Sequence, residues 1–396
     1  MIENIEIKSK VNNKEIENLF VKLNSQNAGE INFAISKETT LTGFGTFPSL
    51  IILFFTWLRL KKGNFIIKID PNNKADLKNF AENYLGYVML LSAWKHRVIV
   101  DMNGNSIRSN FKEFTKEFHK KIDFLTELPN DNLVIPLFDH YSKEQGFSHW
   151  FYTDTYEFPP SPKSLDNSIY RIFEEVGKIY KARLNQNSQA ILDDLQDVIW
   201  ELVGNTHNHA TKDYLNRIEL SPNVRGAYFK IHRSTKENFI KDADEHEGLK
   251  EYYRSVLIPG TNFILEISVF DSGPGLAKRY MGGKWSNELG INEEVLNIKK
   301  CLEKGTSSVN GASGKARGFG LNNVLSTLSK KSGFLKIRSG RASIYRDLKK
   351  TPHFSIQKFE EIELQDWESG DIQKFTSMAP AEGTIITMTY PLIDIS

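Results

Sequence analysis

The chain has 396 residues, 40% hydrophobic and 25% charged, which is ordinary for a globular protein and long enough for two or three domains. Its 51 lysines and arginines nearly balance 49 aspartates and glutamates, so no global field favours nucleic acid or an anionic membrane surface. The only cysteine, Cys301, excludes an intrachain disulfide and any metal site built from several cysteines. Because the N-terminus also lacks the basic-then-apolar order of a secretory signal, we expect a cytoplasmic protein.

The first part of the chain alternates short β-rich runs with longer helical runs. Strands are predicted at residues 31–36, 65–69, 97–102 and 133–138, and helices at 47–60, 74–94 and 110–125. This order predicts an N-terminal α/β domain, residues 1–158, with an at least partly parallel sheet and an unknown function. Its most apolar run, residues 50–58, is too short to cross a bilayer and is expected to form a buried helix. Residues 1–30 receive no assignment.

A proline-rich segment marks the expected domain boundary. Three prolines fall in four positions at 159–162, which opposes regular structure. A linker and leading helix are predicted at 159–184, and apolar residues recur there with a helical period at Ile169, Ile172, Phe173, Val176 and Ile179. Residues 185–396 form the expected C-terminal domain. Within it we expect strands at 226–231, 264–270, 334–339, 354–357 and 385–390, an inserted helix within 236–254 and an exposed excursion at 360–377.

Polar side chains recur along the helix that opens this second domain. Its apolar stripe consists of Ile191, Leu195, Val198 and Leu202, at helical spacing. Glu201, Asn205 and His209 follow one another every four residues on a neighbouring stripe. An acid, an amide and an imidazole beside a buried face are costly unless something binds there. The alternative is an amphipathic helix whose polar side faces water.

Glycine turns appear in two later segments. The apolar run 264–270 ends in Asp271-Ser-Gly273-Pro-Gly275, and the segment 317–324 reads Arg-Gly-Phe-Gly-Leu-Asn-Asn-Val, so that two glycines open a predicted helix. A further pair, Gly383-Thr384, precedes the last predicted strand.

In this order, these segments resemble the N, G1 and G2 boxes of the GHKL ATP-binding superfamily. That superfamily includes DNA gyrase B subunits, MutL-type repair proteins, ninety-kilodalton heat-shock chaperones, sensor histidine kinases and anti-sigma-factor serine kinases. The resemblance covers about residues 185–392. It implies an α/β fold with a two-layer sandwich, in which helices cover a mixed sheet, with ATP and Mg²⁺ as ligands and a mobile lid at 276–317. A protein partner or a homodimer is expected by analogy.

The resemblance implies a role for each matching residue. Asn205 would ligate Mg²⁺ through its side-chain oxygen, and Glu201 would act as general base toward water or a protein hydroxyl. Asp271 would accept a hydrogen bond from the adenine amino group, with Thr384 in support. Lys315 and Arg317 would approach the γ-phosphate. The complete expected nucleotide-binding set is Asn205, Asn208, His209, Asp271, Gly273, Gly275, Lys315, Arg317, Gly318, Phe319, Gly320, Leu321 and Thr384.

The leading prediction is a magnesium-dependent ATPase whose lid and domain motion acts as a regulatory switch. The alternative is a serine/threonine kinase of the anti-sigma type, favoured by the spacing of Glu201, Asn205 and His209. A third possibility is an ATP-gated binding module without turnover. None of His96, His119, His140 and His149 has the surroundings of an autophosphorylation site. His207 and His209, two residues apart on a helix, are not expected to share a metal.

The turn at residues 41–50 is similar to that of STAS-type regulatory domains, the partners of anti-sigma kinases. That similarity would make Ser49 a phosphoacceptor, although the acidic and small residues that usually surround the acceptor serine are absent. The alternative is a plain turn in which the Ser49 hydroxyl caps the following helix.

Overall fold

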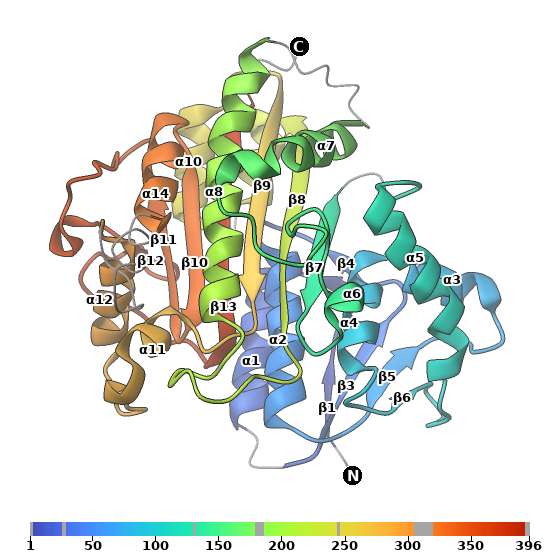
Figure 1. Cartoon of the computed structure of the whole chain (residues 1–396). Helices are drawn as coiled ribbons and strands as arrows, with labels where there is room; N and C mark the ends of the chain where they lie inside the picture. Colours follow the sequence, from blue (N-terminus) through green and yellow to red (C-terminus); the bar gives the residue numbers. More distant parts are fainter. Residues whose placement is uncertain are drawn as a thin grey trace.

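The computed structural model describes residues 3–25, 29–129, 132–178, 186–243, 246–304 and 320–392, without the side chains of 186–191. Two larger sheets organise it, one of four strands and one of seven (Figure 1). The mixture of helices with parallel and antiparallel strands confirms the expected α/β class. Among the described residues, no helix is both long and apolar enough to span a membrane.

The four-stranded sheet is parallel, with strand order β1 (Glu3–Glu6), β3 (Ile31–Ser36), β5 (Phe65–Lys68) and β6 (Ile99–Val100). Its helices are α1 (Asn13–Ser25), α2 (Thr46–Leu60), α3 (Lys74–Ala81), α4 (Tyr84–Ala93) and α5 (Lys112–Phe124), and a 3-10 turn, Arg108–Phe111, precedes α5. A short parallel pair joins β2 (Lys10–Val11) to β4 (Thr40–Leu41). The predicted helix at 74–94 is two helices, because Asn83 caps a new start at α4 by accepting a hydrogen bond from the Leu85 N–H. Residues 1–30, which had no assignment, supply β1, β2 and α1.

The seven-stranded sheet has the order β12-β11-β10-β13-β9-β8-β7. Its strands are β7 (Leu133–Phe138), β8 (Val224–Thr235), β9 (Thr261–Asp271), β10 (Phe334–Gly340), β11 (Ala342–Asp347), β12 (Gln365–Asp366) and β13 (Ala381–Pro391). Where a mixed sheet was expected, each described pairing is antiparallel.

Strand β7 corrects the expected place of residues 133–138. The strand itself is confirmed, but it pairs with β8, from Leu133 opposite Phe229 to Phe138 opposite Val224, and not with the parallel sheet. The strand predicted at 354–357 is also wrong, since Phe354 and Ile356 are 63% and 87% exposed in a turn and bury no face. The division of the chain at residue 158 stays a prediction.

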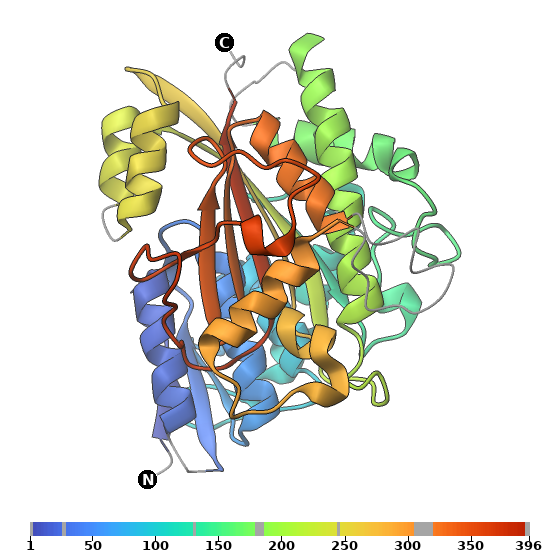
Figure 2. The same cartoon turned by 90° about the vertical axis from the view of Figure 1, so that its left-hand side faces the viewer.

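Helices cover both faces of the large sheet. One face carries α7 (Asp166–Gly177), α8 (Gln186–His209), α12 (Ile291–Leu302) and α14 (Gly320–Lys330), preceded by α11 (Leu276–Met281) and the 3-10 turns Pro162–Leu165 and Gly282–Lys284. The other face carries α1, α2 and α4 below and α9 (Lys236–Asp242) and α10 (Glu247–Val256) above (Figure 2). The remaining short elements are α6 (Lys143–Gly146) and the 3-10 turn Phe359–Glu361.

Helix α2 lies between the two sheets. Residues 46–58 are all buried, as a helix that is apolar on every side must be. Phe54 packs edge-on against Phe33 of the parallel sheet, with ring centroids 4.9 Å apart, while Phe47 stacks at 5.1 Å on Tyr228 of the antiparallel sheet. Ser49 is 5% exposed and donates to the Gly45 carbonyl, so its hydroxyl is not accessible to a kinase and the acceptor hypothesis is wrong for this structure.

Candidate functional site

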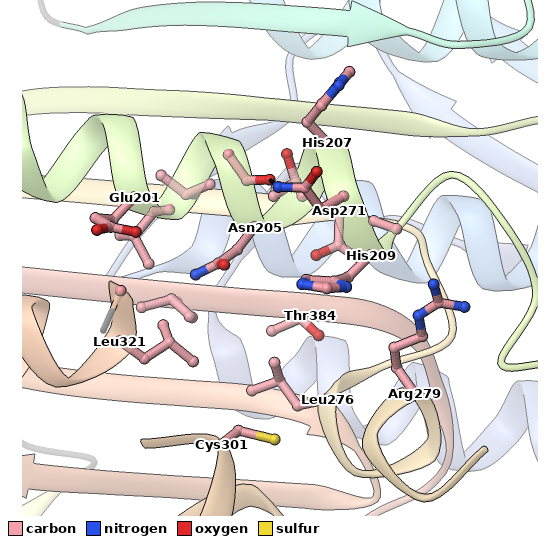
Figure 3. Close-up of a pocket in the computed structure, with 18 of the residues that line it drawn as sticks. Glu201, Asn205, His207, His209, Asp271, Leu276, Arg279, Cys301, Leu321 and Thr384 are labelled. Carbon is pink, nitrogen blue, oxygen red and sulfur yellow. Dashed lines mark hydrogen bonds between the residues drawn. The ribbon is translucent and has the colours of Figure 1, made fainter. Parts of the chain in front are cut away.

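A cavity of about 520 Å³ lies between α8, α11, α12, the start of α14 and the facing strands β9 and β13. Its volume is in the range of small-molecule sites, roughly 300–1,000 Å³. Among its lining residues are most of the predicted set: Glu201, Asn205, Asn208, His209, Asp271, Gly275, Gly320, Leu321 and Thr384 (Figure 3). The sequence prediction therefore selected residues that the fold brings to one pocket.

The side chains of α8 lie on a core face and a cavity face, as its helical periodicity predicts. Leu195, Val198 and Leu202 are no more than 2% exposed and belong to the core. The side chain of Ile191 lies outside the described residues. Figure 3 shows Glu201, Asn205 and His209 on one side of α8 and His207 on another side, where it also belongs to the cavity lining. There the His207 ring stacks on Phe158 and its Nδ1 lies 3.0 Å from the Tyr152 hydroxyl, so His207 and His209 do not converge.

The Asn205 amide is the most informative atom group in the pocket. Its Nδ2 is buried and has no hydrogen-bond partner in the part of the chain that the structure describes. The backbone of Gly320 closes this corner, since a Cβ there would lie 2.4 Å from Glu201 Oε2 and 3.4 Å from Asn205 Nδ2. Buried polar groups are nearly always paired, so this donor is suited to a ligand that enters the cavity.

Glu201 has unusual electrostatics for a carboxyl group. Burial raises its pKa to about 7, and the negative charge of Asp197, one turn earlier on α8, adds to the increase. The group therefore changes charge near neutral pH, where an ordinary carboxyl is fully ionised. Such a pKa is suited to a group that accepts a proton during a reaction.

Asp271 ends β9 at the far side of the pocket and is 8% exposed. Burial raises its pKa to about 6, while the Gly273 N–H donates to its Oδ1 over 2.8 Å and partly offsets that shift. The paired strand β13 places Thr384 directly opposite, and the Thr384 hydroxyl lies 3.1 Å from that of Ser339. A carboxylate and a hydroxyl thus stand side by side on neighbouring strands.

Three glycines allow these segments to approach. Gly383 has φ of 110°, and a Cβ there would lie 1.9 Å from the Asp271 carbonyl oxygen, so only glycine permits β13 to cross at this point. Gly275, with φ of 89°, is the N-cap of α11 and lines the pocket. Gly273 does not line it: a Cβ there would meet Ala210 Cα at 2.7 Å, so this residue serves close packing against the end of α8.

The expected lid at 276–317 is only partly described. Residues 276–304 form α11, a 3-10 turn and α12, and Val295, Ile298 and Leu302 on α12 are at most 1% exposed in the core. Residues 276–304 are therefore packed structure, and a lid over 276–317 stays a prediction. Lys315, Arg317, Gly318 and Phe319 lie outside the described residues.

Several pocket residues had no signal in the sequence. The wall also contains Phe158, Pro159, Pro160 and Trp200, because the proline-rich segment runs along α8 and the Pro159 carbonyl accepts from the Trp200 Nε1–H at 2.9 Å. Arg279, Tyr280 and Cys301 complete the opposite side. Their place follows from tertiary packing and not from any local motif.

Arg59, at the end of α2, supports the pocket from behind. Its Nη2 donates to the Pro222 carbonyl and to Asn223 Oδ1, both at 2.9 Å, and its Nη1 donates to the Ser272 carbonyl and, at 3.2 Å, to Glu382. Ser272 follows Asp271, and Glu382 precedes Gly383. One buried guanidinium from the first part of the chain therefore ties together the two segments that carry Asp271 and Thr384.

Comparisons with protein-family models, with curated proteins and with solved structures found no match.

Proposed function

We propose that the chain binds ATP with Mg²⁺ in the pocket between α8 and the seven-stranded sheet, and hydrolyses it. The observation that carries this proposal is the unpaired Asn205 amide beside Glu201 in a cavity whose other end holds Asp271 and Thr384. A polar corner and a separate carboxylate within one cavity suit a ligand with a polyanionic tail and a planar base.

Different residues contact the adenine and the phosphates of the ligand. Asp271 accepts the adenine amino group, and Thr384 supports this contact. At the other end, the start of α14 at Gly320 directs backbone N–H groups to the phosphates. Glu201 accepts the proton of the attacking water.

The residues around Asn205 fit a magnesium ion bound mainly through phosphate oxygens and water. Such an ion neutralises phosphate charge and needs few protein ligands. Among the described residues, no group of three or more His, Cys, Asp and Glu is placed to hold a metal, so a metal held entirely by such side chains is not part of the proposal. Asn205 would supply one ligand through its side-chain oxygen, and its unpaired Nδ2 would donate to a phosphate oxygen.

As a regulatory switch, the protein would act in the cytoplasm on a protein partner or as a homodimer. Arg59 supports this part of the proposal, because it connects α2 to the turn after Asp271. A change of the turn on nucleotide binding would be transmitted to α2 and its sheet.

Incubation with γ-labelled ATP and Mg²⁺, following free phosphate and protein-bound label together, tests the proposal. We expect free phosphate from the wild type, none from Glu201→Gln or Asn205→Ala, and wild-type turnover from the control Glu174→Gln, whose side chain is 44% exposed on α7. Label retained on protein would instead favour the serine/threonine kinase. Binding without turnover would favour the ATP-gated module, and absence of ATP binding by the wild type would overturn the assignment.

A further inference from the structure

A second cavity, of about 900 Å³, lies on the opposite face of the seven-stranded sheet. Its walls are the start of α1, the turn at residues 39–44 with the beginning of α2, and the helices α9 and α10. In Figure 2, α1 lies below and α9 and α10 lie above on this side of the sheet. The two cavities share no lining residue, because the sheet separates them.

The floor of this rear cavity is polar, unlike the face that packs on α2. Residues of alternating strand positions point into it: Tyr228, Lys230 and His232 from β8, Glu266 from β9, Lys336 from β10 and Thr389 from β13. Glu266 and Lys336 are 2% and 6% exposed. Charges buried on a sheet are costly unless each has a partner. A buried charge without a partner within the protein therefore indicates the kind of ligand that the cavity can bind.

The two inward-facing acids are already engaged. Glu266 accepts from the Gly45 N–H at 3.0 Å through Oε1, and its Oε2 lies 2.8 Å from His232 Nε2. Glu17 receives two hydrogen bonds from Arg338, at 2.8 and 3.1 Å. The acids Asp242 and Glu368 are exposed at the edge, as are Lys10, Lys14 and Lys241. Each of these two carboxylates therefore already has hydrogen-bonding partners of its own.

Lys336 has no such partner. Its Nζ lies 3.8 Å from the centre of the Trp367 ring, and it forms no hydrogen bond or ion pair with any of the residues for which the structure gives positions. An aromatic face attracts a cation but cannot accept three N–H donors. Burial lowers the Lys336 pKa to about 8, and the charges of Glu17, Glu368 and Glu266 offset that decrease only in part.

Asn13 supplies a second unpaired group. Its Nδ2 donates to the Phe44 carbonyl at 2.6 Å, which fixes the orientation of the amide. Its Oδ1 is then buried, with no donor in the described part of the chain. The cavity thus offers a buried cation and a buried acceptor.

We propose that the rear cavity is a second binding site for a small organic anion, whose carboxylate or phosphate is received by Lys336 and whose hydroxyl or amino group donates to Asn13. The volume exceeds that of an inorganic ion and is suited to a metabolite-sized molecule. This site is independent of the proposed ATPase activity, since neither its residues nor its test involves the nucleotide pocket.

Calorimetric titration of the nucleotide-free full chain with two probes tests the site. Glycerol 3-phosphate represents a hydroxylated phosphate and malate a hydroxylated carboxylate, and neutral glycerol is the control ligand. We expect at least one anion to bind at millimolar concentration or better and glycerol not to bind. The anion that binds identifies the group that Lys336 receives.

Lys336→Met, which keeps most of the length and removes the charge, should weaken binding about tenfold or more. Lys349→Met, at an exposed lysine outside the cavity, should bind as the wild type. Asn13→Ala provides a second variant in case Lys336→Met does not fold, and it should also weaken binding. Failure of both anions to bind the wild type, or unchanged affinity in a folded Lys336→Met protein, would overturn the proposal.

Discussion

The first residue of α14, Gly320, lies directly against the carboxylate of Glu201, so that a Cβ at position 320 would stand 2.4 Å from Glu201 Oε2. The absence of a side chain at Gly320 is therefore a condition for the position of Glu201. We expect Gly320→Ala to displace the carboxylate and to lower ATP turnover about tenfold or more, with little change in the free energy of unfolding, because the atom that must move is the end of a flexible side chain.

Gly290→Ala is the matched control, because a Cβ at Gly290 would have no atom within 4 Å and its φ is −66°. Turnover by this control should match that of the wild type. Phosphate release and denaturant unfolding, measured on both variants, separate the two effects. Wild-type turnover by Gly320→Ala would show that the contact does not position Glu201.

The pKa of Glu201 predicts the pH dependence of turnover. Because burial and Asp197 raise that pKa to about 7, the base is protonated in mildly acidic solution, and the rate should increase as the pH rises through about 7. Asp197→Asn removes the neighbouring negative charge and should move the midpoint to lower pH. A pH–rate profile of both proteins checks this, and an unchanged midpoint in Asp197→Asn would contradict it.

The same shift has a consequence for stability. The folded pKa of Glu201 exceeds its ordinary value of 4.5, so its contribution to stability is present below about 4.5 and is lost as the pH rises through about 7. At alkaline pH the wild type carries the cost of the buried charge, and Glu201→Gln should be at least as stable. Thermal unfolding of both proteins from pH 4.5 to above pH 7 measures this difference in stability. A Glu201→Gln variant that is less stable than the wild type above neutral pH would contradict the prediction.

The sequence alone was sufficient to predict the structure wherever a local pattern of residues determines it. The spacing of Leu195, Val198 and Leu202 predicts which face of α8 is buried, and the acid, amide and imidazole on the next stripe follow from the same helical period. The predicted glycines Gly275 and Gly320 could be found because a tight turn or a close approach excludes other residues.

The sequence alone was not sufficient to predict the structure where contacts between distant segments determine it. All six residues of β7 are buried, so its apolar pattern fits a strand in either sheet and does not select β8 as its partner. Strand β11 was missed because its Ser343, Arg346 and Asp347 read as polar loop residues, yet tertiary packing buries them. Arg59 reaches Ser272 across a large sequence separation, and no local pattern marks that contact.

Arg59 should support nucleotide binding without touching the nucleotide. Arg59→Lys keeps a positive charge but cannot donate to Pro222, Asn223 and Ser272 together. We expect a loss of about 2 kcal/mol in unfolding free energy and a weaker affinity for ATP, because the turn after Asp271 loses its support. Arg171→Lys, at a side chain that is 61% exposed, should change neither quantity. Unchanged ATP affinity in Arg59→Lys would show that α2 does not support nucleotide binding in the pocket.

Asp271→Asn separates recognition of the base from stability of the fold. The introduced amide could keep the hydrogen bond from the Gly273 N–H to its oxygen, and would then present an N–H₂ group where the carboxylate presents Oδ2. Two donors would face each other at the adenine amino group, so ATP affinity should fall about a hundredfold. GTP, whose ring carries an oxygen acceptor at the equivalent position, should lose less affinity.

In Asp271→Asn, the free energy of unfolding should not fall with ATP affinity but should stay equal or rise. The folded pKa of Asp271 is about 6 against an ordinary 3.8, so its contribution to stability is present below 3.8 and is lost as the pH rises through about 6. At neutral pH the buried charge is a cost, reduced by the nearby guanidinium groups of Arg225 and Arg59. Asp271→Asn removes that cost, and denaturant unfolding should show equal or higher stability alongside the loss of ATP binding in calorimetry. A destabilised variant that still binds ATP normally would mean that Asp271 supports the fold and not the base.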